Sequence, residues 1–313
     1  MAEISMREAY GRALAELGAV NPRVVALDVD TSTSTLSNFF GHRFPERFFN
    51  IGIAEPCMVD VAVGLALAGQ IPFINGFASL LSLRALEQIR TCVCYGRTNV
   101  KIAASYAGLS DFKDGATHYS ITDLANLRAL PGMTVIVPAD ADEAAAWVPI
   151  VAEFDGPVYF RISRAGTLAV PSSGSPLQVG KGRTLRAGND LTLVAIGSMV
   201  GRCALAAEQL ATLGIDARLL EIHTLKPLDS DLILQAASET GALVSAEEHN
   251  IIGGLGSAVA EVLSEGCPVP LERVAIHDHF CPTGRNLDIL MDTCGLSVKE
   301  IIGASQRVLG RKK

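Results

Sequence analysis

The sequence predicts an α/β protein with two doubly wound, mainly parallel-sheet domains joined by a linker. Short apolar runs rich in β-branched residues alternate with longer, alanine-rich stretches of helical period. Buried parallel strands show such continuous apolar runs, and their crossover helices cover both faces of the sheet. The alternation lapses once, between Ser163 and Asn189, where Gly, Pro and Ser are abundant, and then resumes. The lapse marks the expected linker.

In the first half, strands are expected at residues 24–27, 71–74, 100–104, 134–137 and 158–161, with helices at 59–68, 80–95, 122–129 and 142–153. In the second half, strands are expected at 191–196, 217–221, 242–246 and 271–275, with helices at 201–213, 230–240, 256–264, 286–294 and 297–308. We therefore expect one domain over residues 1–165, a linker over 166–189 and a second domain over 190–313.

Composition excludes several classes of function. The 313 residues are 49% hydrophobic and only 19% charged, so the chain can bury a large core. The 26 basic and 33 acidic residues are spread without long blocks, so we expect no nucleic-acid partner. No apolar run reaches the roughly 18 residues that a membrane span requires. We therefore expect a cytoplasmic protein without a membrane partner.

The cysteines and histidines do not predict a metal site. The seven cysteines show no C-x2-C spacing, and the sequence favours reduced thiols packed as small apolar side chains. His277 and His279 would share one face of a strand, but no third ligand is evident. We expect no metal ligand on this chain.

Three segments could carry chemistry. Glu55 ends the apolar segment FFNIGIAEP, where it is either a helix-start residue that complements the helix dipole or a buried functional acid. Asp114 and His118 lie in DGATH, a turn before a helix that could bind an oxygen-rich anion or have no function. Arg164 directly follows a strand, where a guanidinium could bind phosphate or simply be solvated.

A glycine-rich turn at residues 247–259, EEHNIIGGLGSAV, is not a nucleotide-binding fingerprint. Val259 stands where the last glycine of G-x-G-x-x-G belongs, and the P-loop lysine is missing. Close backbone approach or helix packing is the expected use of these glycines.

Several stretches, in this order, resemble the C-terminal half of the transketolase family: RFFNIGIAEP, KDGATHYSITDLANLRALPGMTVIVPAD, YFRISR, LEIHTLKPLD and ETGALVSAEEHNIIGGLGSAVAEVL. The resemblance covers essentially the whole chain. It implies a pyrimidine-binding domain followed by a transketolase C-terminal domain, and thiamine diphosphate with Mg²⁺ as cofactors.

The resemblance also implies residue roles toward the cofactor. Glu55 matches the catalytic acid that bonds to the pyrimidine ring nitrogen and favours the tautomer that activates the cofactor. Phe77 is expected to support the pyrimidine ring, with Arg84 close by.

Further roles concern the substrate. His118 is expected to assist proton movements or hold sugar hydroxyls, and Asp114 to contact a hydroxyl. Arg164 and Ser34 are expected to hold the sugar phosphate. Tyr106 stands where many transketolases have a substrate-binding histidine, which suggests a non-standard ketose.

One family motif is absent. No Gly-Asp-Gly occurs in the sequence, although the family holds the cofactor's diphosphate and magnesium with this motif and a later asparagine. By resemblance the chain is the C-terminal subunit of a split transketolase, active only with a separate diphosphate-binding N-terminal subunit in a heterodimer or heterotetramer.

The expected activity is the transfer of a two-carbon ketol (glycolaldehyde) unit from a ketose phosphate to an aldose phosphate in carbohydrate metabolism. Alternatives are a branched ketose phosphate such as apulose 4-phosphate, a deoxyxylulose phosphate synthase-like enzyme, a 2-oxo acid dehydrogenase beta subunit, and a non-catalytic regulatory subunit. DGATH together with Arg164 favours sugar phosphates over a lipoyl partner.

Overall fold

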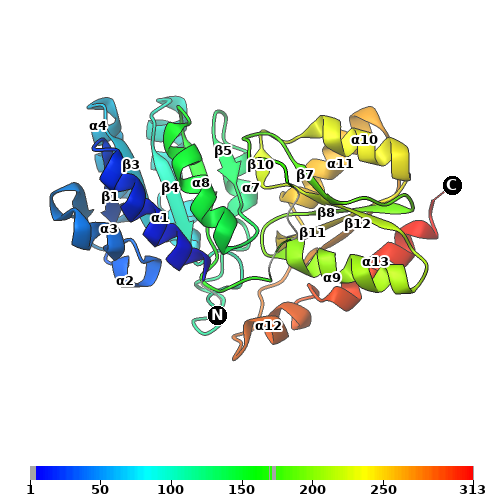
Figure 1. Ribbon diagram of the computed structural model, residues 1–313. Coiled ribbons are helices and arrows are strands. Elements are labelled where there is room, and N and C mark those ends of the chain that lie inside the picture. The colour runs from blue at the N-terminus through cyan, green and yellow to red at the C-terminus, as the bar shows by residue number, and fades with distance from the viewer. Residues whose placement is uncertain (1–4, 169, 171–173, 313) are drawn as a thin grey trace. The chain divides into compact units, whose positions relative to one another are not determined.

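The computed structural model describes residues 5–168, 170 and 174–312. The chain forms two compact units, each built on its own sheet (Figure 1). The first unit comprises Met1–Asp111 and Thr117–Thr167, and the second comprises Phe112–Ala116 and Leu168–Lys313. Residues 169 and 171–173 of the expected linker lie outside the described residues. The α/β fold class is confirmed.

In the first unit, the strands run in the order β5–β6–β4–β3–β1–β2, and each neighbouring pair is parallel. They are β1 (Val24–Asp28), β2 (Phe48–Asn50), β3 (Ile71–Phe77), β4 (Lys101–Ser105), β5 (Thr134–Ile136) and β6 (Val158–Arg161). All residues of β1, β4, β5 and β6 are buried. Burial on both faces explains why these strands are mostly apolar and do not alternate between apolar and polar residues.

The helices of this unit include α1 and α8, which lie side by side across one face of the sheet (Figure 1). The helices are α1 (Met6–Val20), α2 (Ser32–Thr35), α3 (Asn38–Arg43), η1 (Pro45–Arg47), α4 (Glu55–Leu67), α5 (Ala78–Arg84), α6 (Leu86–Gln88), η2 (Ile89–Tyr95), α7 (Asp123–Arg128) and α8 (Ala141–Glu153). The single helix expected at 80–95 is wrong in detail, because the chain breaks after Arg84 and continues as a π-helix in η2.

In the second unit, the strand order is β12–β11–β8–β9–β7, parallel except for β7, which is antiparallel to β9. Helices α10 and α11 cover one face and α9 and α13 the other (Figure 1). The strands of this sheet are β7 (Arg183–Arg186), β8 (Leu191–Ala195), β9 (Ala217–Glu221), β11 (Leu243–Asn250) and β12 (Leu271–Ile276). The short strand β10 (Thr224–Lys226) is not part of this sheet. The helices are α9 (Met199–Thr212), α10 (Ser230–Thr240), α11 (Leu255–Gly266), α12 (Leu287–Thr293) and α13 (Val298–Leu309).

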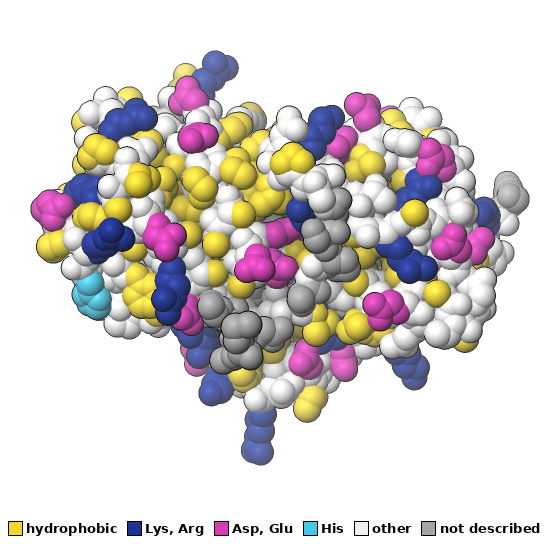
Figure 2. Space-filling model, in the orientation of Figure 1, with side chains coloured by type: hydrophobic (Ala, Val, Ile, Leu, Met, Phe, Trp, Pro, Cys, Tyr) yellow, Lys and Arg dark blue, Asp and Glu magenta, His cyan; other side chains and the backbone are white. Residues whose placement is uncertain are grey.

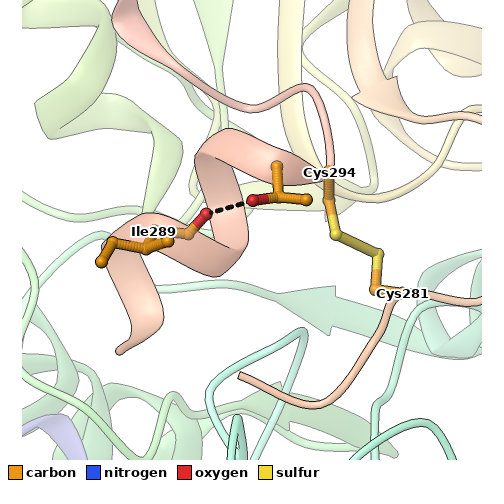
Figure 3. Close-up of a disulfide and its surroundings, with 4 residues drawn as sticks. Cys281, Ile289 and Cys294 are labelled. Carbon is orange, nitrogen blue, oxygen red and sulfur yellow. Dashed lines mark hydrogen bonds between the residues drawn. A yellow bond between two sulfur atoms is a disulfide. The ribbon is translucent and has the colours of Figure 1, made fainter. Parts of the chain in front are cut away.

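A disulfide joins Cys281 to Cys294 (Figure 3). Their Cα atoms are 6.3 Å apart, within the range of normal disulfides. The expectation that every cysteine is a free thiol is therefore wrong for this pair, whereas Cys57, Cys92, Cys94, Cys203 and Cys267 are free. Spacing alone could not show this pairing, because the turn before α12 brings together two cysteines that are 13 residues apart.

Acidic and basic side chains are interspersed with hydrophobic ones on the face shown in Figure 2. This distribution agrees with the mixed charge of the sequence. Within the described part of the chain, no helix is long and apolar enough to cross a membrane.

A buried lysine links β4 to the turn that precedes β6. Lys101 is fully buried, and its Nζ donates to the carbonyl oxygens of Phe154 at 2.5 Å and Gly156 at 2.8 Å. Burial lowers the pKa of Lys101 from 10.5 to about 7, with a smaller opposing effect from Asp155.

This pKa predicts a pH-dependent stability. Between pH 7 and pH 10.5 the unfolded chain binds a proton at Lys101 that the folded chain does not, so native stability should rise with pH. Relative to Lys101→Met, the free energy of unfolding should increase by at most about 1.4 kcal/mol per pH unit across this window. Urea unfolding of both proteins across this range measures the difference. A difference that does not change with pH would show that Lys101 keeps its ordinary pKa.

Candidate active site

The candidate site residues of the first unit follow the carboxyl ends of its parallel strands. Ser34 follows β1 and Glu55 follows β2. Phe77 ends β3, and Tyr106 directly follows β4. Arg164 comes shortly after β6. Because all these strands are parallel, their carboxyl ends lie at one edge of the sheet, where α/β proteins bind ligands.

The loop that carries Ser34 is shaped by a buried carboxylate at the end of β1. Asp28 Oδ1 accepts hydrogen bonds from the backbone N–H and the hydroxyl of Thr31, and Oδ2 accepts from the hydroxyls of Thr35 and Ser37. Burial raises the pKa of Asp28, while these hydrogen bonds act in the opposite direction. The network holds the chain in a tight turn around Ser34.

Glu55 is the first residue of α4 and is only 2% exposed. Its Oε1 accepts a hydrogen bond of 3.2 Å from Nη1 of Arg84, the last residue of α5. Among the described residues, no donor contacts its Oε2. The position at the helix start favours a carboxylate.

An aromatic group lies at the ends of β3 and β4. Tyr106 stacks on Phe77 with ring centroids 4.1 Å apart and an interplanar angle of 23°. His118 meets Phe77 edge-on at 6.1 Å, and its Nδ1 lies 3.0 Å from the hydroxyl of Thr117. Tyr106 has a φ of 61°, a left-handed conformation that is rare outside glycine. The structure therefore brings Phe77, Tyr106 and His118 together.

Two guanidinium groups contact Tyr106. The Cζ of Arg164 lies 5.1 Å from the ring centroid, and Nη1 of Arg164 donates to Asp111 Oδ1 at 2.9 Å. Arg7 Nη1 donates to the Tyr106 hydroxyl at 3.0 Å and to the carbonyl oxygen of Ser34 at 2.6 Å. Arg7 is not among the site residues expected from the sequence. Nothing near it in the sequence marks it as functional, because it simply lies in an amphipathic stretch. The pair of cations makes this part of the site suitable for an anion.

Asp114 belongs to a different unit from the other candidate residues. It is exposed and belongs to Phe112–Ala116, a segment that is part of the second unit. His118, four residues later, belongs to the first unit.

A buried ion pair supports the chain that follows His118. Arg161 Nε donates to Asp123 Oδ2 at 2.8 Å, and Arg161 Nη2 donates to the carbonyl oxygen of Ser120 at 3.0 Å. The hydroxyl of Tyr159 also donates to Asp123 Oδ2. Arg161 and Asp123 are 5% and 0% exposed, so this pair fixes the segment between His118 and α7.

The glycine-rich turn of the second unit serves local packing. Glu247 accepts from the backbone N–H groups of Leu255 and Gly256 at the start of α11. A Cβ atom on Gly254 would lie within 1.9 Å of Glu247 Oε2, so a side chain there would displace this carboxylate. Among the described residues no group of three or more His, Cys, Asp or Glu side chains could hold a metal ion.

Comparisons with known proteins identify the family of this chain. Residues 2–167 match the transketolase pyrimidine-binding domain, and residues 180–301 match the transketolase C-terminal domain. The chain belongs to the transketolase family.

Two relatives match over nearly their full length. The 6-deoxy-6-sulfo-D-fructose transketolase subunit of Clostridium sp. (strain MSTE9) is 41% identical over 98% of this chain and 95% of its own length. An apulose-4-phosphate transketolase subunit of Phocaeicola vulgatus is 36% identical over 91% of this chain and 92% of its own. A solved split-gene transketolase, described as an inactive β4 tetramer, superposes with a TM-score of 0.90 at 46% identity, covering both chains completely.

The Arg161–Asp123 pair predicts a large mutational effect. Arg161→Leu should lower the free energy of unfolding by about 3–5 kcal/mol, because it leaves the buried Asp123 carboxylate without its cation. Urea unfolding at neutral pH measures this loss. The matched control is the double variant Arg161→Leu, Asp123→Leu, which removes both charges and should be more stable than the single variant. Equal stability of the two variants would contradict this explanation.

Proposed function

We propose that this chain is the Glu55-bearing subunit of a thiamine-diphosphate-dependent transketolase. The enzyme would transfer a two-carbon ketol unit from a ketose phosphate to an aldose phosphate. The observation that carries this proposal is the nearly buried Glu55 carboxyl, whose Oε1 is bound by Arg84 and whose Oε2 has no donor among the described residues. A buried acid with one free oxygen at the carboxyl edge of the sheet is suited to bind a ring nitrogen of a cofactor.

The residues present fit the pyrimidine end of the cofactor. Thiamine diphosphate, when bound, supplies the carbon nucleophile that carries the two-carbon unit. Glu55 would hold a proton between its Oε2 and the pyrimidine ring nitrogen, and the Arg84 guanidinium would keep the carboxyl oriented. Phe77 is half-buried, so part of its ring surface can contact the pyrimidine.

The diphosphate end requires other residues. The sequence contains no Gly-Asp-Gly, and in the described residues no group of acidic, His or Cys side chains could hold magnesium. We infer that a separate chain supplies the diphosphate and Mg²⁺ ligands, so that activity depends on a heteromer. Two relatives that are named as transketolase subunits support this inference.

The substrate's terminal anion would bind between Arg7 and Arg164. Arg164 lies on the ring of Tyr106, and Arg7 bonds to its hydroxyl. That hydroxyl accepts from Arg7, and no acceptor for its own proton is found among the described residues, so it can donate to a ligand oxygen. His118 would move protons at a sugar hydroxyl through the ring nitrogen that does not face Thr117. Asp114 would contact another hydroxyl.

A second candidate substrate differs in the sugar and not in the reaction. The two relatives described above are named for a sulfonated ketose and for apulose 4-phosphate. Two guanidinium groups and a phenol hydroxyl can bind a tetrahedral oxyanion of either kind. Assays with a phosphorylated, a sulfonated and a branched donor would identify the substrate.

The role of Glu55 predicts a loss of turnover. Together with a diphosphate-binding transketolase chain, thiamine diphosphate and Mg²⁺, Glu55→Gln should lower kcat by about 10²-fold or more, because its side chain cannot hold the acidic proton. A coupled assay of ketose cleavage with an aldose phosphate acceptor measures this. Glu46→Gln, a change at an exposed glutamate, is the matched control and should keep full activity. Full activity of Glu55→Gln would refute the assignment.

The proposed role of Arg164 predicts that its removal weakens the binding of phosphorylated donors selectively. Arg164→Ala should raise KM for a donor with a terminal phosphate by about 10-fold to 100-fold, because a charge-assisted contact is lost. The value of kcat/KM for an uncharged donor such as erythrulose should change little. Equal losses with both donors would show that Arg164 only supports the fold.

A further inference from the structure

The Phe112–Ala116 segment rests on a turn of the second unit. The backbone N–H of Gly284 donates to the carbonyl oxygen of Phe112 at 2.8 Å. Thr283 lies against Gly115, since a Cβ atom there would come within 2.5 Å of the Thr283 hydroxyl. Gly115 has a φ of 85°, so its backbone follows a path that few other residues adopt. The segment that carries Asp114 is therefore shaped by Thr283 and Gly284.

This turn begins at the disulfide. Cys281 is bonded to Cys294, which directly follows α12 (Figure 3). Both cysteines are 2% exposed, whereas Phe280 is 80% exposed and Thr283 is also exposed. The sulfur bridge therefore ties the start of this exposed turn to the end of α12.

The other end of the bridge is anchored to the fold. Arg202 of α9 donates to Asp288 at 2.7 Å and to Asp292 at 2.8 Å, which fixes α12. Leu290 and Met291 of α12 are buried. The disulfide therefore connects a fixed helix to the turn that supports the Asp114 segment.

We propose that the Cys281–Cys294 disulfide is a redox-controlled positioning element for the Asp114 segment. The bridged state holds Thr283 and Gly284 against Phe112–Ala116, and the reduced state releases them. The effect on substrate binding rests on the proposed function, in which Asp114 contacts a sugar hydroxyl. Cofactor activation by Glu55 does not depend on the bridge.

The chemistry is thiol–disulfide exchange with a dithiol. One thiolate of the dithiol attacks a bridge sulfur, the sulfur–sulfur bond breaks, and a mixed disulfide forms. The second thiol of the dithiol then displaces the protein sulfur. Two electrons and two protons pass to the protein, which ends with two thiols, and the dithiol ends as a cyclic disulfide. Because both cysteines are buried, exchange follows a local opening of the turn.

Hydrogen exchange tests the coupling without any assay of activity. The full chain is compared after oxidation with oxidised glutathione and after reduction with dithiothreitol. Reduction should speed exchange of the Gly284 amide, and of the peptide covering Phe112–Ala116, by about tenfold or more. The double variant Cys281→Ser, Cys294→Ser should exchange fast in both conditions. Cys267→Ser, which removes a free thiol of the same unit, should behave as the native chain does.

Two results would overturn the proposal. The first is alkylation of all seven cysteines in the oxidised, then denatured chain, where five are expected to react. The second is identical exchange of the Gly284 amide in the oxidised chain, the reduced chain and the double variant. With the partner chain present, reduction should raise KM for the sugar about threefold or more and leave kcat within about twofold. Absence of any transketolase activity would refute the proposed function and leave the exchange result to decide the redox coupling.

Discussion

The parallel arrangement of the first sheet is the constraint on which the candidate site depends. Two parallel strands cannot be joined by a tight turn, so each is followed by a crossover that returns the chain to the same starting edge. As a result, the segments after β1, β2, β3, β4 and β6 all emerge at the opposite edge. Arg7 meets Tyr106 at a separation of 99 positions because both lie at this edge. No local sequence motif can therefore indicate this contact.

The same edge holds an unusual amount of backbone strain. Asp30, Leu36 and Tyr106 all have a positive φ, although none is a glycine. Each such residue costs about 1 kcal/mol or more, and it persists only where the surroundings fix it. The Asp28 network fixes the turn that contains Asp30 and Leu36, and the contacts with Phe77 and Arg7 fix Tyr106. The strain therefore indicates a site whose shape is set before a ligand arrives.

Most of the fold could be predicted because its strands are buried on both faces. The residues of β1, β3, β4 and β6 are mostly apolar, and their expected positions agree with the structure within a few residues. By contrast, β2 has only three residues and is partly exposed, so it is too short to be recognised as a strand within the segment FFNIGIAEP. The edge strand β7 pairs on one side only and lies in the glycine-rich stretch that predicted a linker. Helix α1 was missed although Met6, Tyr10 and Leu14 recur at helical spacing.

For the candidate site, only the resemblance pointed to single residues. The stacking of Tyr106 on Phe77 and the cation pair around it depend on tertiary contacts, so neither could follow from spacing. The adjacency of Asp114 and His118 in DGATH was also misleading in one respect, since the two residues belong to different units. The bond between Cys281 and Cys294 likewise depends on the turn before α12. Spacing in the sequence carries no information about such pairings.

The burial of the Glu55 carboxyl has a free-energy cost that bears on the proposed function. A carboxyl that is nearly buried, with one oxygen lacking a donor, costs free energy that a polar side chain exposed to water would not. Arg84 offsets only part of this cost, because its own side chain is 53% exposed and water weakens the pair. A cofactor nitrogen at Oε2 would complete the hydrogen bonding of the carboxyl. Under the proposed function, the ligand that binds with the partner chain offsets the cost of this incompletely bonded acid.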